Sequence, residues 1–267
     1  MIRILAIGDI VGFPGRRIIK ARLAELRRER AIDFVVANGE NVSGGSGLRP
    51  EEADDLFKSG VDVITGGDHV WDKRELIPYA ERNDRVLRPA NYPAEQPGRG
   101  FGVYTVRDGL RIGVIHVQGR VFMNVHAECP YKTCDAAFEK IRSQTPIVVV
   151  DFHGEATSEK IAAGWHLDGR ASFVFGTHTH IMTADERVLP KGTAYITDVG
   201  MTGPYDSVIG RRKEAVLSRF LTQIPTRLEV ADGDTRLCTA LAEVDEKTGR
   251  ASRIERLVLT EDGATRS

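Results

Sequence analysis

The chain has 267 residues and a formal net charge of −1, with 41% hydrophobic and 28% charged residues. Such a composition provides ample material for a hydrophobic core and excludes an intrinsically disordered chain. No apolar run approaches the roughly 18 to 20 residues that span a bilayer, and residues 2–7 lack a signal-peptide cleavage pattern. We therefore expect a cytoplasmic protein without a membrane partner. The balanced charge also argues against duplex nucleic acid and favours a small-molecule partner.

Length and cysteine content bound the organisation further. The length allows one large domain or two smaller ones, and we expect a single domain over 1–267, with no internal repeat. A homo-oligomer is compatible with the same features. The three cysteines, Cys129, Cys134 and Cys238, cannot form a fully paired disulfide framework, which suits a reducing compartment.

Strand and helix patterns alternate in the first quarter of the chain, where short apolar runs are followed by glycine-rich turns and longer amphipathic stretches. We expect, in chain order, a strand at 2–7, a helix at 16–30, a strand at 34–37, a helix at 50–59 and a strand at 61–65. Parallel βαβ units are the natural arrangement of this order.

The remaining patterns predict a mixed sheet content and therefore an α/β fold. Strands are expected at 102–106, 111–117, 147–151, 172–175 and 194–197, with helices at 134–142 and 158–164. The C-terminal part predicts antiparallel strands joined by Asp-Gly and Thr-Gly turns, at 227–230, 236–244 and 253–259.

Side chains that can bind metals follow five of the expected strands. They are Asp9; Glu40 and Asn41; Asp68 and His69; His153; and His178 and His180. In an open α/β sheet the carboxyl ends of the strands border the crevice where ligands bind, so these side chains are expected to converge. A mixed set of carboxylates and imidazoles suits Mn, Fe or Zn, whereas calcium prefers oxygen ligands alone and structural zinc or iron–sulfur sites need thiolates.

Each segment also has an ordinary structural interpretation. Asp9 is compatible with a helix cap, Glu40-Asn41 with a turn, and His153 with a hydrogen-bonded, partly buried histidine. The His178-Thr-His180 pair is harder to explain structurally, because alternating histidines at a strand exit can aim two imidazoles at one centre. The joint pattern favours a metal centre. The other histidines have no comparable context and are expected to be structural or solvent-facing: His116, His126 and His166.

Some further features leave two interpretations open. The glycine-rich segment 44–47 lacks the Walker ending and is expected to be a flexible rim. The basic clusters 16–17 and 211–213 either steer phosphate or solvate the surface, with the surface role favoured. Trp71 and Tyr205 either stack on a base or pack in the core.

Together, these segments resemble the calcineurin-like metallophosphoesterase superfamily and, within it, the YmdB-like branch of 2′,3′-cyclic-nucleotide phosphodiesterases. The resemblance runs nearly end to end and is carried by Gly8–Gly12, Asn38–Asn41, Gly66–Asp72, Asp151–Lys160, Gly176–His180 and Thr197–Pro204. It implies a four-layer αββα sandwich with two mixed β-sheets, which agrees with the order of elements above.

The resemblance also implies a ligand set for two transition metals, Fe or Mn, with Zn as an alternative. One metal would be held by Asp9, Glu40, Asn41 and His180, and the second by Glu40, Asp68, His153 and His178. A metal-bridging hydroxide would then attack a small phosphodiester such as a 2′,3′-cyclic nucleotide, with His69 as general acid. The alternatives are a nucleotide-binding sensor with little turnover and a phosphomonoesterase.

Two departures from the family pattern concern the ligands. The wider superfamily begins with Asp-x-His, whereas Val11 stands two residues after Asp9, and Asn41 is expected to fill that gap. The family places asparagine before the general acid, whereas this chain has Asp68. The carboxylate lowers the positive charge of the centre, and the chain loses an amide donor that could contact phosphate.

Overall fold

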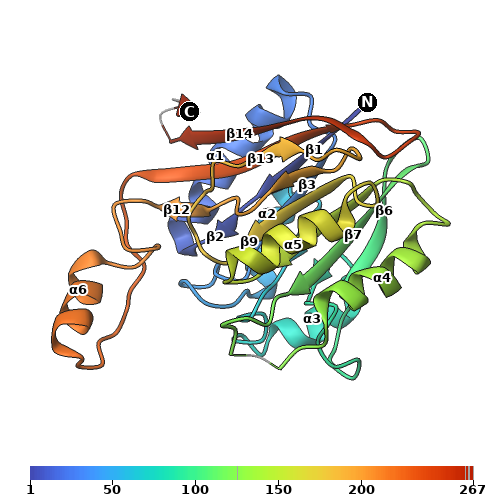
Figure 1. Cartoon of the computed structure of the whole chain (residues 1–267). Helices are drawn as coiled ribbons and strands as arrows, with labels where there is room; N and C mark the ends of the chain where they lie inside the picture. The colour runs from blue at the N-terminus through green and yellow to red at the C-terminus, as the bar shows by residue number, and fades with distance from the viewer. Residues whose placement is uncertain (125, 262, 264, 267) are drawn as a thin grey trace.

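The computed structural model describes residues 1–267 except 125, 262, 264 and 267, and it shows two mixed β-sheets (Figure 1). The first sheet contains β1 (Ile2–Ile7), β2 (Asp9–Ile10), β3 (Phe34–Asn38), β4 (Val63–Thr65), β5 (Val86–Leu87), β12 (Met201–Pro204), β13 (Thr235–Val244), β14 (Ala251–Thr260) and β15 (Thr265–Arg266). Its main order is β15-β14-β13-β1-β3-β4-β5. The strands from β1 to β5 along this order are parallel, whereas β13 pairs antiparallel with β1.

The second sheet is also mixed. It contains β6 (Phe101–Arg107), β7 (Leu110–Gln118), β8 (Val148–His153), β9 (Phe173–Thr177), β10 (Arg187–Val188) and β11 (Ala194–Ile196), in the order β10-β11-β9-β8-β7-β6. The inner strands β7, β8, β9 and β11 are parallel, and both edge strands pair antiparallel with their neighbours. Both sheets therefore present the carboxyl ends of parallel strands.

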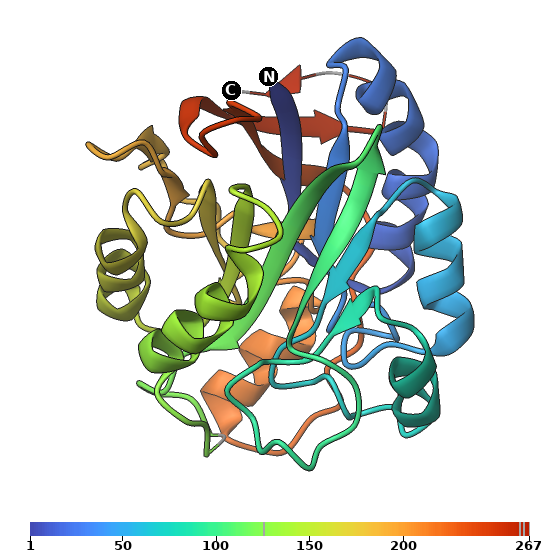
Figure 2. The same ribbon diagram turned by 90° about the vertical axis from the view of Figure 1, so that its right-hand side faces the viewer.

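Helices form the two outer layers (Figure 2). The described helices are α1 (Gly12–Glu29), α2 (Pro50–Lys58), α3 (Leu76–Arg82), α4 (Pro130–Ile141), α5 (Thr157–Leu167) and α6 (Lys213–Thr222), of which α6 lies outside the layers. The blue helices α1 and α2 lie on one flank of the paired sheets, and the green helix α4 and the yellow helix α5 lie on the opposite flank. The arrangement is the four-layer αββα sandwich that the resemblance implied.

Three hydrophobic cores lie between the four layers, and the period-two alternation of the strands assigns residues to them. Ile4 of β1 packs with Phe173 of β9 between the two sheets. Leu5, the next residue along β1, packs with Ile18 of α1 on the outer side of the first sheet. Phe138 of α4 belongs to the third core, on the outer side of the second sheet. None of the described helices is long and apolar enough to cross a bilayer.

The structure corrects three expectations about elements. The first helix begins at Gly12 rather than at 16, because Pro14 is compatible with the first helical turn. The expected strand at 227–230 is wrong, since within this segment only an isolated bridge joins Val230 to Arg211. Helices α3 and α6 were not expected. Figure 1 shows α6 on an arm that stands apart from the sheets.

Candidate metal centre

Five strand ends bring the expected side chains to one edge of the sandwich. Asp9 follows β1, Glu40 follows β3 and Asp68 follows β4, all parallel strands of the first sheet. From the second sheet, His153 is the last residue of β8 and His178 comes directly after β9. Because the two sheets face each other, ligands from both converge at this edge.

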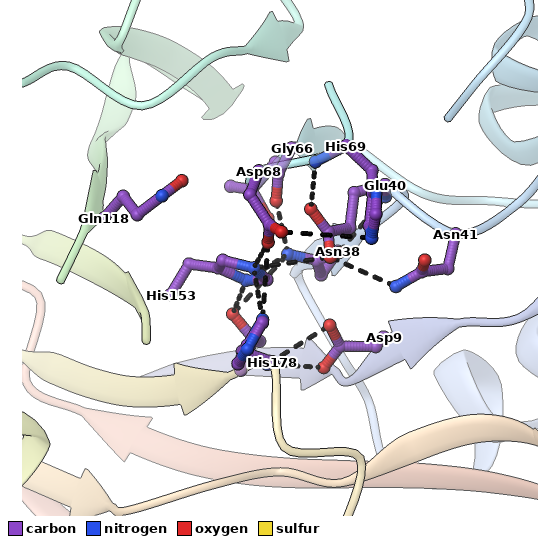
Figure 3. A network of polar contacts seen from close by, with 12 residues as sticks. Asp9, Asn38, Glu40, Asn41, Gly66, Asp68, His69, Gln118, His153 and His178 are labelled. Atoms are coloured by element: carbon purple, nitrogen blue, oxygen red, sulfur yellow. Dashed lines mark hydrogen bonds and ion pairs between the residues drawn. The ribbon is translucent and has the colours of Figure 1, made fainter. Parts of the chain in front are cut away.

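Four of these side chains form a compact group (Figure 3). One donor atom from each of Glu40, Asp68, His153 and His178 lies within 4.8 Å of the others. His153 Nε2 is 3.0 Å from Asp68 Oδ1, 3.3 Å from Glu40 Oε1 and 3.1 Å from His178 Nδ1. Two carboxylates and two imidazoles that surround one point fit a transition-metal ion.

The other predicted ligands lie beside this group. His180 Nε2 is 3.9 Å from Asp9 Oδ1 and 3.3 Å from Asn41 Nδ2. Asn41 in turn donates from Nδ2 to Glu40 Oε1 at 3.1 Å. Glu40 therefore contacts side chains of both sets.

Hydrogen bonds behind two histidines fix which ring nitrogen faces the centre. His153 Nδ1 lies 2.9 Å from Thr177 Oγ1, and Thr177 donates to Asp151 Oδ1 at 2.8 Å, so His153 Nε2 is left for the centre. His180 Nδ1 lies 3.0 Å from the carbonyl of Ile209, which leaves its Nε2 facing Asp9. Partners of this kind orient metal-binding imidazoles in proteins.

Burial and mutual charge shift the pKa values of this group strongly. Burial would lower the pKa of His153, but the carboxylates of Glu40 and Asp68 outweigh it and raise the pKa well above the ordinary value. Burial would raise the pKa values of Glu40 and Asp68, but the neighbouring imidazoles outweigh burial and lower both pKa values, mainly His153 for Glu40, and His153 with His178 for Asp68. For Asp9 burial dominates and its pKa is raised. The same carboxylates that favour a proton on His153 would favour a bound cation, and a cation would compete with that proton.

His69 lies at the rim of the group. Its backbone N–H donates to Glu40 Oε2 at 3.0 Å, and its Nε2 is 3.9 Å from Asp68 Oδ2. Its Nδ1 is 2.9 Å from Asp72 Oδ2, and the hydroxyl of Ser46 donates to the same oxygen. The carboxylate of Asp72 therefore holds the ring with Nε2 directed to the centre.

Sequence reasoning assigned no role to several residues that support the centre. Asp72, Asp151 and Thr177 lie within or next to the segments that carry the resemblance, and only their position there could have pointed to them. Asn38 belongs to the same class, because its Oδ1 accepts from Glu40 N at 3.1 Å and its Nδ2 donates to Gly66 O at 2.5 Å.

The structure shows the surroundings of three features that had two interpretations: the loop 44–47, Arg211 and Trp71. The loop 44–47 borders the site as a rim, and the half-buried guanidinium of Arg211 donates to the carbonyls of Gly44 and Gly45. Arg211 is therefore not the surface charge that was favoured. Trp71 donates to Gln96 Oε1 at 2.8 Å, which accounts for its indole N–H within the protein.

Four residues of the two basic clusters, and His116, have structural partners. Arg16 and Arg17 pair with acidic side chains, as do Arg212 and Lys213 on the arm. Among the remaining histidines, His116 is completely buried with Nδ1 3.4 Å from Asp151 Oδ2, which is the structural role expected of it.

Comparison with known proteins identifies the family. A family model described as "YmdB-like protein" matches residues 5–257. The chain belongs to the YmdB-like family. It thereby falls in the calcineurin-like metallophosphoesterase superfamily, as its motifs implied.

YmdB-like relatives match over nearly the whole chain. A Bacillus subtilis protein named 2′,3′-cyclic-nucleotide 2′-phosphodiesterase is 45% identical over 260 residues, which cover 97% of this chain and 98% of the relative. A crystal structure of a hypothetical protein from Thermus thermophilus has a TM-score of 0.90 at 40% identity, covering 97% and 99% of the two chains. A structure described as a novel phosphatase from Mycoplasma pneumoniae has a TM-score of 0.91 at 33% identity, covering 97% and 93%.

Proposed function

We propose that this chain is a metal-dependent phosphodiesterase that hydrolyses small phosphodiesters, with 2′,3′-cyclic nucleotides as its substrate class. The convergence of carboxylates and imidazoles from five strand ends, with His69 at their rim, is the observation that carries the proposal. The B. subtilis relative, whose name states this activity, supports the substrate class. The free cysteines among the described residues support the cytoplasm as its compartment.

We further propose that the residues of the site hold two transition-metal ions, Fe or Mn, with Zn as an alternative. One ion would be held by Asp9, Glu40, Asn41 and His180, and the other by Glu40, Asp68, His153 and His178. When bound, such ions supply positive charge for the phosphate oxygens and lower the pKa of the attacking water. The mixed oxygen and nitrogen donor set fits these ions, and it contains no thiolate that would favour a structural site.

The protein's own groups would handle the leaving oxygen. His69 is held by Asp72 through Nδ1, so its Nε2 can carry a proton toward the site. The ribose oxygen of a cyclic phosphodiester is a poor leaving group unless it is protonated as the bond to phosphorus breaks. Supplying this proton is the task of a general acid. Because water is the nucleophile, no side chain needs to form a covalent bond to phosphorus.

The test uses protein stripped of metal with a chelator and reloaded separately with Mn, Fe(II) or Zn. Each form is assayed on 2′,3′-cyclic nucleotides, 3′,5′-cyclic nucleotides and nucleoside monophosphates. We expect turnover of the 2′,3′-cyclic substrates that is lost on stripping and regained on loading. Preferential turnover of monoesters would instead show a phosphomonoesterase, and tight nucleotide binding without turnover under every metal would show a sensor.

A further inference from the structure

Two of the segments that carry the resemblance, 151–160 and 197–204, each contain a charged residue with no role assigned above. The structure brings these two residues, Lys160 and Asp198, into contact. Lys160 lies on α5, and Asp198 follows β11. Both side chains are only 1% exposed, and Lys160 Nζ lies 2.6 Å from Asp198 Oδ2. The pair is a buried salt bridge between residues 38 positions apart.

Asp198 is the anchor of the loop that carries two of the proposed ligands. Its Oδ2 accepts hydrogen bonds from the backbone N–H of Thr179 at 3.2 Å and from Thr179 Oγ1 at 2.7 Å. Its Oδ1 accepts from Gly200 N at 2.7 Å. Since Thr179 stands between His178 and His180, the carboxylate holds the residue from which both imidazoles diverge.

The loop needs such an anchor because its backbone is strained. His178 has a φ of 100° and His180 a φ of 66°, both in the left-handed region that residues with a side chain rarely adopt. Strain of this kind persists only where the surroundings hold the backbone in place. With this backbone conformation, the side chains of His178 and His180, two residues apart, both face the metal centre.

Lys160 places a positive charge directly beside the buried carboxylate of Asp198. A buried carboxylate without a counter-charge would be strongly disfavoured, and only the ionised form accepts hydrogen bonds at both oxygens without donating one. The glycine at 176 is required by close packing, because a Cβ there would collide with the backbone carbonyl of Thr197, next to Asp198, and would also lie 2.9 Å from Lys160 Cδ. Gly176 thus lets the strand that precedes Asp198 approach closely, and the lysine stem passes beside the same position.

We propose that Lys160 is a positioning residue for the metal centre, which acts through Asp198 and Thr179 to hold His178 and His180 in their metal-binding orientation. This inference rests on the metal centre proposed above. It assigns Lys160 at the end of the 151–160 segment and Asp198 near the start of the 197–204 segment to the support of the ligands.

Equilibrium binding of Mn²⁺ to the metal-free protein, followed by calorimetry, tests the inference without any activity measurement. We expect Lys160→Met and Asp198→Asn each to weaken Mn²⁺ binding by about 10- to 100-fold, the usual effect of losing a partner behind a metal ligand. Thr179→Val, which removes one hydrogen bond and little else, should weaken binding in the same direction. Ile141→Ala, a core truncation on α4, is the control and should lower the thermal midpoint without changing Mn²⁺ affinity.

The double variant Lys160→Met with Asp198→Asn separates positioning from stability. Because it removes both buried charges, its thermal midpoint should recover toward that of the parent, while its Mn²⁺ affinity should stay low. Unchanged Mn²⁺ affinity in folded Lys160→Met and Thr179→Val would overturn the inference alone. Failure of the parent protein to bind Mn²⁺ would instead overturn the metal centre on which it rests.

Discussion

We propose that the imidazole of His69 transfers a proton rather than binding metal, because it lies at the rim and Asp72 holds its Nδ1. We expect His69→Ala to lower kcat by about 10²- to 10⁴-fold on a poor leaving group while both metals remain bound. Steady-state kinetics combined with metal analysis checks this. His166→Ala, a surface histidine paired with Asp135, is the matched control. Full turnover by the His69 variant would remove the acid from the mechanism.

Asp68 is the residue whose identity departs from the family pattern. Its Oδ1 lies 3.0 Å from His153 Nε2 and 3.4 Å from His178 Nδ1. Asp68→Asn removes one negative charge from the centre and restores an amide donor, so an anionic phosphate should be held more strongly. We expect higher phosphodiesterase activity at equal metal content. Equal or lower activity in a fully loaded variant would refute this.

The raised pKa of His153 predicts how the affinity for metal changes with pH. In the metal-free fold, His153 holds its proton to pH values above 6.5, the ordinary pKa of histidine. A metal ion that binds must displace that proton. Apparent Mn²⁺ affinity should therefore increase as pH rises from about 6.5 through the raised pKa, by up to about tenfold per pH unit. Mn²⁺ titrations at several pH values measure the slope. His153→Gln should flatten it, and a pH-independent affinity in the parent would contradict the assignment.

At the scale of elements, helix α6 lies on an arm that Figure 1 shows apart from the sheets. Leu221 on this helix is 83% exposed, whereas Val216 is 6% exposed. We expect Leu221→Lys to change the free energy of unfolding by less than about 0.5 kcal/mol, and Val216→Lys to cost clearly more. Urea denaturation of both variants tests the arrangement. A large loss for Leu221→Lys would show that the arm packs differently.

Strand ends are the elements that determine the site. Short strands stop where glycine and polar residues begin, and the next polar residue is then a candidate ligand, as for Asp68 after β4. This local rule placed the proposed ligands without knowledge of their mutual distances. Helix α6 could not be predicted from the sequence for a different reason. It buries little more than Val216, so it has almost no apolar stripe directed at a core.

At the scale of the whole molecule, the two ends of the chain share one sheet. β1 pairs with β3 on one side and with β13 on the other, so the first and last parts of the chain complete each other. We propose that residues 1–267 form one domain. Metal-free protein should then unfold in a single calorimetric transition whose van't Hoff and calorimetric enthalpies agree. Two separable transitions would indicate two units.

The sequence by itself determined the α/β class, most of the strands and the side chains that gather at the site, because strand periodicity and polar residues at strand ends are local signals. The tertiary structure decided which ring nitrogens face the centre, through Thr177 behind His153 and Ile209 behind His180. It also decided that Arg211 holds the rim and that Lys160 meets Asp198. These contacts join residues far apart in the chain and have no periodic signature, so only the packing of the two sheets and their connecting loops fixes them.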